Sequence, residues 1–369
     1  MIGLSIGWRL AAAGCRVDIY ERDVAGYGAS WAAAGMLAAG IETEPGELAL
    51  HALNRASQLM WPDFARELEA ATGLPVGYRA EGTLRVALNR DDAARLRATY
   101  EFQRQNGIAM EWLSGAEARR REAHLAAGVT AALFSASDHQ VDNRLLVPAL
   151  IAAFRHAGGH LHESAGVQRI EIARGRVTGV RVDEVTVPAD TVVLAAGAWS
   201  REIDGLPVAS RPPVRPVKGQ MLALRMDAAA PLLNHVLWAP RAYLVPRADG
   251  RLIVGASVEE RGFDPSLTAG AILALLEAAW RVLPGIEELP IDEMWAGFRP
   301  GSRDDAPVLG ACSVDGLVLA TGHHRNGILL TPITADAISR LVLSGEQDPA
   351  IEAFSLDRFA QPARTRETA

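Results

Sequence analysis

Two residues near the start of the chain, Gly3 and Glu21, have the types and the spacing of a nucleotide-binding motif. Dinucleotide folds join a strand, a G-x-G-x-x-G turn, a helix and a second strand that ends in an acidic residue. Gly3 stands where the third glycine belongs, and Glu21 follows 18 residues later, where a carboxylate can accept hydrogen bonds from a ribose. The first strand and the first two glycines of the motif do not precede Gly3. The pair therefore favours nucleotide binding without identifying it.

Three further segments are rich in glycine or alanine and would let a flat cofactor approach the backbone. Residues 28–37 (GASWAAAGML) have few large side chains, and Ser30 could cap a helix that points at a phosphate. Close helix packing is the alternative explanation for this segment. Residues 192–200 (VVLAAGAWS) have the pattern of a buried strand that runs into a glycine turn, and residues 322–327 (GHHRNG) connect another strand to the last long helix.

The composition sets the broad class of protein. The chain has 369 residues, of which 49% are hydrophobic and 22% charged, as is typical of a globular protein of about two domains. The formal net charge is −7, from 37 basic and 44 acidic residues, and the basic residues are spread along the chain. Nucleic-acid binding, which needs a basic surface, is therefore not expected. Of the 37 basic residues only Lys218 is a lysine.

Cysteine, histidine and hydropathy patterns argue against a disulfide-rich, metal-binding or membrane protein. Cys15 and Cys312 are too few for a disulfide framework or a four-cysteine zinc site, and both are expected to be free core thiols. His323 and His324 lack carboxylates at ligand spacing, so no metal site is predicted. No leader-like segment and no apolar run approaching ~18 residues is found. We therefore expect a cytoplasmic protein without a membrane partner.

Hydrophobic periodicity predicts an α/β fold with a separate β-rich region. Both ends of the chain have the pattern of βα units, and the middle has that of antiparallel strands, with Asp249-Gly250 at a hairpin turn. Helices are expected at 4–13, 46–72, 91–106, 143–157, 267–281 and 327–343, and Asp142 is expected to cap the fourth. Strands are expected at 16–20, 83–88, 129–134, 160–162, 167–173, 176–182, 192–196 and 317–320, and the stretch 291–299 follows a proline-rich turn without an assignment.

Four motifs in this order resemble the D-amino acid oxidase superfamily of FAD enzymes, and most closely its glycine oxidase branch of thiamine biosynthesis. The motifs are 28–37, 216–220 (PVKGQ), 297–300 (GFRP) with Asp305 and Pro307 beyond it, and 322–330 (GHHRNGILL). The resemblance runs from Gly3 to about Phe359.

The resemblance implies a fold and a reaction. The fold is a Rossmann-like FAD-binding domain, discontinuous and N-terminally truncated, at 1–80, 141–212 and 302–369. A substrate domain with a mainly antiparallel sheet is implied at 81–140 and 213–301. The implied reaction is oxidative deamination of glycine, sarcosine or a small D-amino acid to an imine, with O₂ reduced to hydrogen peroxide.

The positions that match the family motifs imply roles in substrate binding. Arg299 aligns with the arginine that binds the substrate carboxylate, which suits a guanidinium with two parallel donors. Tyr243 resembles the tyrosine that donates a hydroxyl to the same carboxylate, and Arg325 resembles an arginine close to both flavin and substrate. Val258 stands where glycine oxidases usually carry a methionine beside the substrate, so the shape of the side-chain pocket stays open.

The resemblance also implies a cofactor shell. Within it, the backbone of Val167 meets the adenine, and Gly327 and Ile328 place the amino end of the last helix at the flavin. Cys312 does not align with the cysteine that tethers FAD in sarcosine oxidases, so noncovalent FAD is expected. A homo-oligomer and a contact with the thiazole synthesis machinery are further expectations. The shell comprises Gly3, Glu21, Arg22, Ala29, Ser30, Gly35, Met36, Val167, Ala196, Gly197, His324, Arg325, Asn326, Gly327 and Ile328.

Two other functions are compatible with these residues. The same fold could serve a D-amino acid or sarcosine dehydrogenase that passes electrons to a non-oxygen acceptor, although no amphipathic basic segment suggests a membrane quinone. A chain without the first strand and the phosphate-loop glycines could instead be a flavin-free, inactive paralogue. We favour a start codon placed too late, at an internal methionine, because the motifs downstream are intact.

Overall fold

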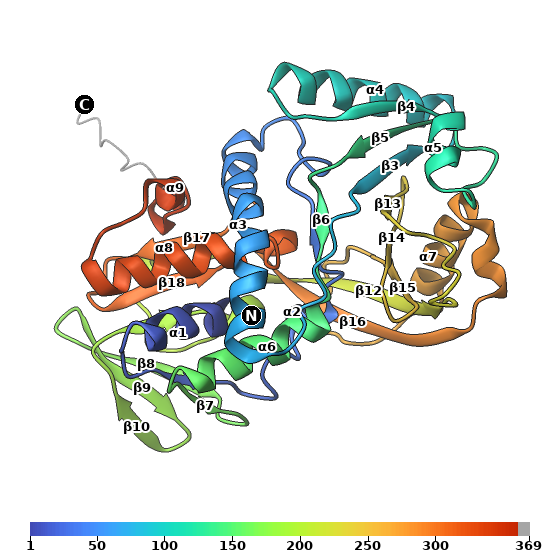
Figure 1. Cartoon of the computed structure of the whole chain (residues 1–369). Helices are drawn as coiled ribbons and strands as arrows, with labels where there is room; N and C mark the ends of the chain where they lie inside the picture. Colours follow the sequence, from blue (N-terminus) through green and yellow to red (C-terminus); the bar gives the residue numbers. More distant parts are fainter. Residues whose placement is uncertain (361–369) are drawn as a thin grey trace, which may run out of the picture.

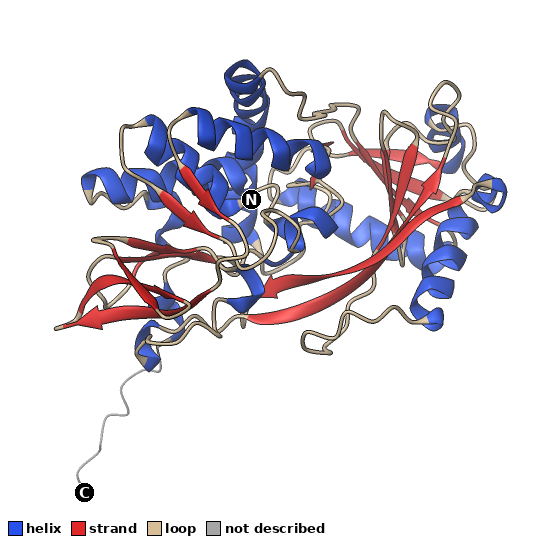
Figure 2. Cartoon of the chain, turned by 90° about the horizontal axis from the view of Figure 1, so that it is seen from below, coloured by secondary structure: helices blue, strands red, loops and turns tan. Residues whose placement is uncertain are grey.

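The structure is a computed structural model that describes residues 1–360. Residues 361–369, part of the predicted segment 302–369, lie outside the described residues. The chain forms two parts that lie side by side, one rich in helices and one dominated by a large sheet (Figures 1 and 2). The predicted α/β class is confirmed.

Four helices, α1, α3, α6 and α8, gather in the helical part (Figure 1). Both α1 and α3 pack against α6 and α8. This position explains the apolar residues all around α1, because a helix with neighbours on two faces has little solvent side. The α-helices of the described residues are α1 (Ile2–Ala12), α2 (Ala29–Ala32), α3 (Leu48–Thr72), α4 (Arg90–Gln105), α5 (Gly115–Arg121), α6 (Asn143–His156), α7 (Ala269–Val282), α8 (Thr331–Ser344) and α9 (Pro349–Glu352).

Two small sheets with parallel strands accompany these helices. In the first, β1 (Asp18–Tyr20) pairs with β7 (His160–His162). In the second, β11 (Val192–Leu194) pairs with β18 (Leu317–Thr321), and β18 also pairs with the antiparallel strand β17 (Val308–Ala311). Within residues 1–360, β1 and β11 each have a strand partner on one edge only. The parallel sheet of this part is therefore split between β1 and β11.

Two antiparallel ribbons complete the helical part. The strands β8 (Val167–Ala173), β9 (Arg176–Val182) and β10 (Val185–Pro188) form a three-stranded sheet in the order β10-β9-β8. Its buried side chains share one core with those of β11 and β18. The short strands β2 (Met36–Leu37) and β6 (His139–Gln140) pair with each other near the junction of the two parts (Figure 1).

An eight-stranded sheet forms the second part, and its two longest strands reach toward the helical part (Figure 2). All neighbouring pairs are antiparallel except β13 with β3, as expected for a mainly antiparallel sheet. In spatial order the strands are β16 (Ile291–Gly301), β12 (Arg215–Arg225), β15 (Arg251–Gly255), β14 (Tyr243–Pro246), β13 (Val236–Trp238), β3 (Thr83–Ala87), β5 (Ala131–Ser135) and β4 (Glu111–Ser114).

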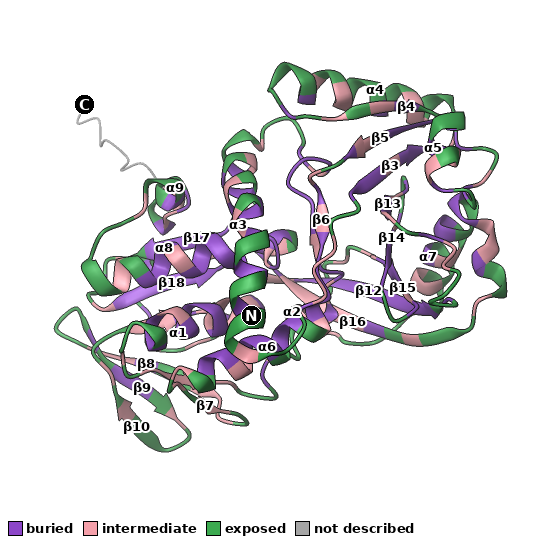
Figure 3. Cartoon of the chain, in the orientation of Figure 1, coloured by how far each residue is buried: buried purple, intermediate pink, exposed green. Residues whose placement is uncertain are grey.

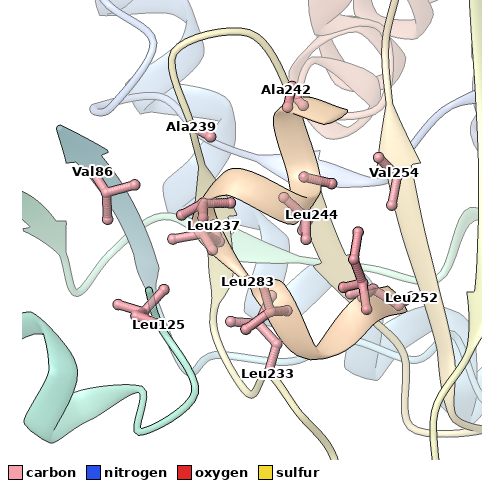
Figure 4. Close-up of a cluster of buried hydrophobic side chains, with 14 of the residues drawn as sticks. Val86, Leu125, Leu233, Leu237, Ala239, Ala242, Leu244, Leu252, Val254 and Leu283 are labelled. Atoms are coloured by element: carbon pink, nitrogen blue, oxygen red, sulfur yellow. The ribbon is translucent and has the colours of Figure 1, made fainter. Parts of the chain in front are cut away.

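One face of this sheet is covered by α7, which packs on β12 and β15. Leu237, Leu244 and Leu252 from the strands meet Leu283, which follows α7 (Figure 4). Burying a leucine stabilises a fold by roughly 1.5–3 kcal/mol, so this face holds the second part together. Figure 3 shows the same burial along β12 and β15, and also along β18 in the helical part.

Most expected elements occur, with shifted ends. The last long helix begins at Thr331, where Pro332 occupies its first turn, rather than at residue 327. Residues 324–326 form a 3₁₀ turn instead, and His324 has a φ of +46°, which is incompatible with an α-helix. The expected strand 16–20 is regular only at Asp18–Tyr20. The strands β4, β10 and β17 were not expected from the sequence.

Candidate active site

A cavity of about 2110 Å³ lies between the two parts and is lined by residues of both. Ordinary ligand pockets have volumes of roughly 300–1,000 Å³, so this cavity has room for a large cofactor beside a substrate. It brings together all the residues that the sequence predicted for the site, whose roles stay predictions. Those residues are Gly3, Glu21, Arg22, Ala29, Ser30, Gly35, Met36, Val167, Ala196, Gly197, Tyr243, Arg299, His324, Arg325, Asn326, Gly327 and Ile328.

The amino end of α1 opens on this cavity. No side chain of the described residues caps α1, and its first turn holds no acidic residue, so its first backbone N–H groups are left for another acceptor. Such an end binds phosphate readily. Glu21, directly after β1, lines the same cavity, as the predicted fingerprint requires. Ser30 does not cap a helix as expected, because it lies inside the short helix α2.

Two glycines that line the cavity have positive φ angles. Gly35 has a φ of +67°, and a Cβ atom there would lie 1.9 Å from the carbonyl oxygen of Val141, so no larger residue fits. Gly197 has a φ of +54° and follows β11, and a Cβ atom there would have no neighbour within 4 Å. The backbone at Gly197 therefore faces open space in the cavity wall, where a flat ring can approach it.

Arg299 and Tyr243 reach toward each other from two strands that are not neighbours. Arg299 lies on β16 and Tyr243 on β14, with β12 and β15 between them. A Cβ atom on Gly219 of β12 would lie 2.6 Å from Nη1 of Arg299. A Cβ atom on Gly255 of β15 would lie 2.6 Å from the ring and the hydroxyl of Tyr243. Two glycines on the middle strands thus form a floor over which both side chains extend.

The guanidinium of Arg299 has few protein partners. Its Nη1 donates to the carbonyl oxygens of Ser257, at 3.2 Å, and Lys218, at 3.5 Å. Within residues 1–360 no carboxylate lies within 4.0 Å of it. A half-buried arginine without a carboxylate partner is suited to bind an anionic ligand in a two-pronged manner.

The hydroxyl of Tyr243 stays protonated in this setting. Burial raises the pKa of Tyr243 above its ordinary value, and the negative charge of Glu42 adds to this, whereas the positive charge of Arg299 opposes it. The hydroxyl lies 3.7 Å from the sulfur of Met221, a weak acceptor. Tyr243 is therefore able to donate a hydrogen bond to a ligand held by Arg299.

Arg325 differs from Arg299, because carboxylates already hold it. Its Nε lies 3.1 Å from Glu42, and its Nη2 lies 2.8 Å from Glu47. Burial raises the pKa of Glu42 to about 7, although the charge of Arg325 opposes this shift. Glu42 also lines the cavity, and sequence reasoning missed it. Its place shortly after the small-residue segment 28–37 is the one sequence signal that could have identified it.

The two histidines of the loop after β18 are neutral near pH 7. Burial lowers the pKa of His323 to about 3 and that of His324 to about 4, and for His324 the charges of Arg299 and Arg325 add to the effect. Both side chains line the cavity. Because α8 begins at Thr331, residues 327 and 328 lie in a turn before the helix, which corrects the expectation that they form its amino end.

Aromatic contacts join the two parts beside the cavity. The ring of Trp199, just after Gly197, stacks on Phe263 at a centroid distance of 4.8 Å. The guanidinium of Arg22 lies 3.5 Å from the centroid of the Trp199 ring. Arg22, a predicted cofactor residue, is therefore stacked on a tryptophan that belongs to the same cavity wall.

The cavity also extends into the gap between β1 and β11. Val17 and Ile19 on one side and Val193 and Ala195 on the other belong to its lining, as does Cys15. The cavity lining does not include Cys312. In the part of the chain that the structure describes, no three His, Cys, Asp or Glu side chains are arranged to hold a metal ion. No helix in that part is long and apolar enough to cross a membrane.

Comparisons with known proteins agree with this geometry. A family model described as FAD dependent oxidoreductase matches residues 1–341. The chain is 40% identical to the bifunctional protein ThiO/ThiG of Synechocystis, over 97% of this chain and 53% of that protein. It is 36% identical to the glycine oxidase of Geobacillus kaustophilus, over 97% of this chain and 94% of that protein. The chain thus spans about half the length of the bifunctional relative.

A solved structure extends the likeness to the fold. The crystal structure of glycine oxidase from Geobacillus kaustophilus superposes with a TM-score of 0.90 at 34% sequence identity. The superposition covers 98% of this chain and 96% of the other. Nearly the whole chain therefore shares one architecture with that structure, and the cavity lies inside the shared region.

Proposed function

Because the chain belongs to the D-amino acid oxidase family of FAD-dependent oxidoreductases, we propose that it oxidises the amine of a small amino acid, with glycine as the leading substrate. Sarcosine and small D-amino acids are the other candidates. The proposed reaction takes two electrons and two protons from the substrate to give an imine, which water hydrolyses to the 2-oxo acid. Oxygen accepts the electrons and protons and becomes hydrogen peroxide.

The convergence of Arg299 and Tyr243 over a glycine floor carries this proposal. Among residues 1–360, two backbone carbonyls are the hydrogen-bond partners of Arg299, and Tyr243 is protonated beside it. A carboxylate bound there would receive parallel donors from the guanidinium and one donor from the phenol. The small amino acids carry such a carboxylate next to the carbon that is oxidised, so this anchor fixes the reacting atoms.

The residues present fit FAD as the cofactor. The uncapped start of α1 suits the diphosphate, and Glu21 suits a ribose. The open space beside the backbone of Gly197 suits the flat ring system. When bound, FAD accepts the hydride that leaves the substrate Cα.

The protein residues contribute binding and orientation. Arg299 and Tyr243 fix the carboxylate, which leaves the Cα–H bond in one orientation. Arg325 lines the cavity and is held in place by Glu42 and Glu47 through its Nε and Nη2. The neutral state of His324 leaves the cavity without a further positive charge at its wall.

The fused relative ThiO/ThiG motivates a second part of the proposal. The imine made from glycine would then supply thiazole synthesis in the pathway to thiamine. A homo-oligomeric state, a contact with the thiazole synthesis proteins and a cytoplasmic location belong to the same proposal. None of these rests on a feature of the cavity.

The test is to purify the protein, measure its flavin spectrum and follow oxygen consumption and hydrogen peroxide with glycine, sarcosine, D-alanine and D-proline. We expect bound flavin, and peroxide formed in proportion to the substrate consumed. Acid precipitation should release the flavin, because Cys312 lies away from the cavity. Turnover only with an artificial dye would show a dehydrogenase, and a protein that takes up no flavin would show the inactive alternative.

A further inference from the structure

We propose that Lys218 is a positioning residue for the substrate carboxylate, because it ties the segment 256–268 to β12 and so fixes the backbone carbonyl that orients Arg299. This inference rests on the proposed function in one respect, that the carboxylate binds at Arg299. It assigns a role to Lys218 of the motif 216–220, of which only Gly219 lines the cavity.

Lys218 is unusual for a lysine in its burial. Its side chain has 0% exposure, and it is the only lysine of the chain. Its Nζ donates to the carbonyl oxygen of Ser266 at 2.5 Å and lies 3.6 Å from the carboxylate of Asp264. Taking an ammonium group out of water costs free energy, and an apolar side chain of similar volume often serves stability as well. A buried lysine at this place therefore suggests a need for defined geometry.

The segment 256–268 follows β15 and is bound to β12 at several points. Backbone hydrogen bonds run in both directions between Lys218 and Glu259, each 3.0 Å long. The Gln220 side chain donates to Glu259 at 2.8 Å and accepts from the backbone N–H of Thr268 at 2.8 Å. With the contact from Lys218 to Ser266, the segment is held near its beginning and near its end.

The same segment holds Arg299 from one side. The guanidinium Nη1 donates to the carbonyl oxygen of Ser257, which lies in the segment, and to the carbonyl oxygen of Lys218 itself. Ser257 is in turn bound to β12, because its hydroxyl accepts from the backbone N–H of Gln220 at 2.8 Å. Lys218 thus contributes one carbonyl directly and secures the segment that carries the other.

The tilt of the guanidinium follows from these two carbonyls. Gly219 leaves the guanidinium free to lie flat on β12, and therefore its orientation within that plane depends on its hydrogen bonds. Two parallel donors meet a carboxylate only at one orientation, and small misplacements cost much of the rate and affinity. If the segment 256–268 becomes mobile, Arg299 keeps its charge, but its guanidinium is no longer held in the orientation that a carboxylate needs.

The experiment compares two probes in the flavin-loaded protein. Glycolate keeps the carboxylate of glycine and lacks its amine, and glycolamide has nearly the same shape without the charge. Binding of each is followed by the change in flavin absorbance and, independently, by tryptophan fluorescence. The variants are Lys218→Met, Lys218→Arg and Asp264→Ala. The last is placed at a partly exposed residue that also holds the backbone of Ser266 at 2.9 Å.

We expect Lys218→Met to raise the dissociation constant of glycolate at least about tenfold, with that of glycolamide and the flavin content unchanged. Lys218→Arg, which keeps a donor for Ser266, should restore glycolate binding to within about threefold of the wild type. Asp264→Ala should weaken glycolate about threefold or more. In a protein that carries Arg299→Lys, the added Lys218→Met should have no further effect, because no guanidinium is left to position.

The matched control is Arg225→Met, which removes a cation from the other end of β12, where Arg225 pairs with Asp292. It should leave both probes unaffected. The proposal is overturned if Lys218→Met weakens both probes alike. It is also overturned if glycolate binding is unchanged in Lys218→Met, or in Asp264→Ala where Lys218→Met does not fold. If Arg299→Lys alone binds glycolate as tightly as the wild type does, the proposed function is refuted as well. The two failures are therefore distinguishable.

Discussion

Arg299 is the residue whose removal should separate substrate binding from cofactor binding. Its guanidinium faces the cavity with no carboxylate partner among the described residues, so a substrate carboxylate would complete its hydrogen bonding. We expect Arg299→Ala to lower kcat/KM for glycine about a hundredfold or more, the effect of roughly 3 kcal/mol from charged hydrogen bonds. Steady-state kinetics and the flavin-to-protein ratio provide the measurement.

The control for this prediction is Arg299→Lys, which keeps the charge and loses the planar fork. It should fall between the wild type and Arg299→Ala in kcat/KM, with an unchanged flavin content. A variant that loses flavin but keeps its KM for glycine would place Arg299 in the cofactor shell and contradict the assignment.

Glu42 should give the protein a pH-dependent stability. Its pKa is raised from the ordinary 4.5 to about 7, chiefly by burial. Between these pH values the folded protein holds a proton that the unfolded chain has released, so stability falls as the pH rises through this window. The loss amounts to about 3 kcal/mol when complete at pH 8. The variant Glu42→Gln cannot ionise and should not show this loss.

The measurement is the difference in unfolding free energy between wild type and Glu42→Gln from pH 5 to pH 8. The lowered pKa values of His323 and His324 act in the opposite sense, because stability due to them is lost as the pH falls below 6.5. Both proteins contain these histidines, so their effect cancels in the difference. A difference that stays constant over the range would show that Glu42 is ionised in the folded protein at pH 5.

At the scale of elements, one side chain in the turn between β14 and β15 fastens the segment 33–35, which lines the cavity. Arg247 lies in that turn and is 4% exposed. Its burial lowers the pKa of its guanidinium to about 10. Its guanidinium donates to the carbonyl oxygens of Ala34, at 2.8 Å, and Val141, at 2.9 Å. Ala34 precedes Gly35 in the chain, and the backbone N–H of Val141 donates to the carbonyl oxygen of Gly35. Arg247 also binds Gln140 at 2.9 Å and Asn143 at 3.0 Å. The hairpin of the sheet part therefore holds the segment around Gly35 in the helical part.

We expect Arg247→Met to lower the free energy of unfolding by about 3–5 kcal/mol, because it leaves several buried acceptors without a donor. It should also weaken FAD binding, since the backbone at Gly35 loses its support. Urea unfolding and flavin titration measure the two effects. Arg66→Met is the control, since the pair of Arg66 with Asp63 is exposed and should contribute less than about 0.5 kcal/mol. A stability of Arg247→Met equal to that of the control would rule out this fastening role.

Local signals in the sequence sufficed for several elements. Asp142 caps α6 by accepting from the N–H of Arg144 at 3.0 Å, as expected from its type and place. Gly250, with a φ of +89°, turns the predicted hairpin between β14 and β15. The start of α8 was predicted wrongly, because the apolar run before Thr331 looks helical while its residues are buried in a turn. Burial of that run depends on the surrounding core, which no local pattern contains.

The candidate site was predictable only where it coincides with a motif. All the residues predicted for the site line one cavity, whereas of the motif 216–220 only Gly219 does. The glycine floor under Arg299 and Tyr243 was not predictable, because it depends on the strand order β16-β12-β15-β14. Glu42 and the contact from Lys218 to Ser266 were missed for the same reason, since each joins segments far apart in the chain.

For the whole molecule, the gap between β1 and β11 is the feature with the largest expected effect on stability. Each of these strands has one edge without a strand partner in residues 1–360, and the cavity extends between Val17 and Val193. Unpaired backbone groups along a half-buried strand edge and apolar side chains that line an open gap both cost free energy. In dinucleotide folds a Gly-x-Gly turn before the first helix cradles the diphosphate, and the amino end of α1 opens on the cavity.

We therefore expect that a short extension before Met1 stabilises the protein and raises its flavin content. The extension would be a strand of valine and isoleucine followed by a Gly-x-Gly turn, which supplies backbone partners for both open edges and side chains for the gap. Melting temperature, soluble yield, bound flavin and peroxide production from glycine should all rise relative to the 369-residue form. An extension of the same length made of glycine and serine is the control, because it adds chain without β-propensity or apolar surface. Equal behaviour of the two extended proteins would mean that the gap accepts no strand, since only the first offers the edges a partner that can stay paired.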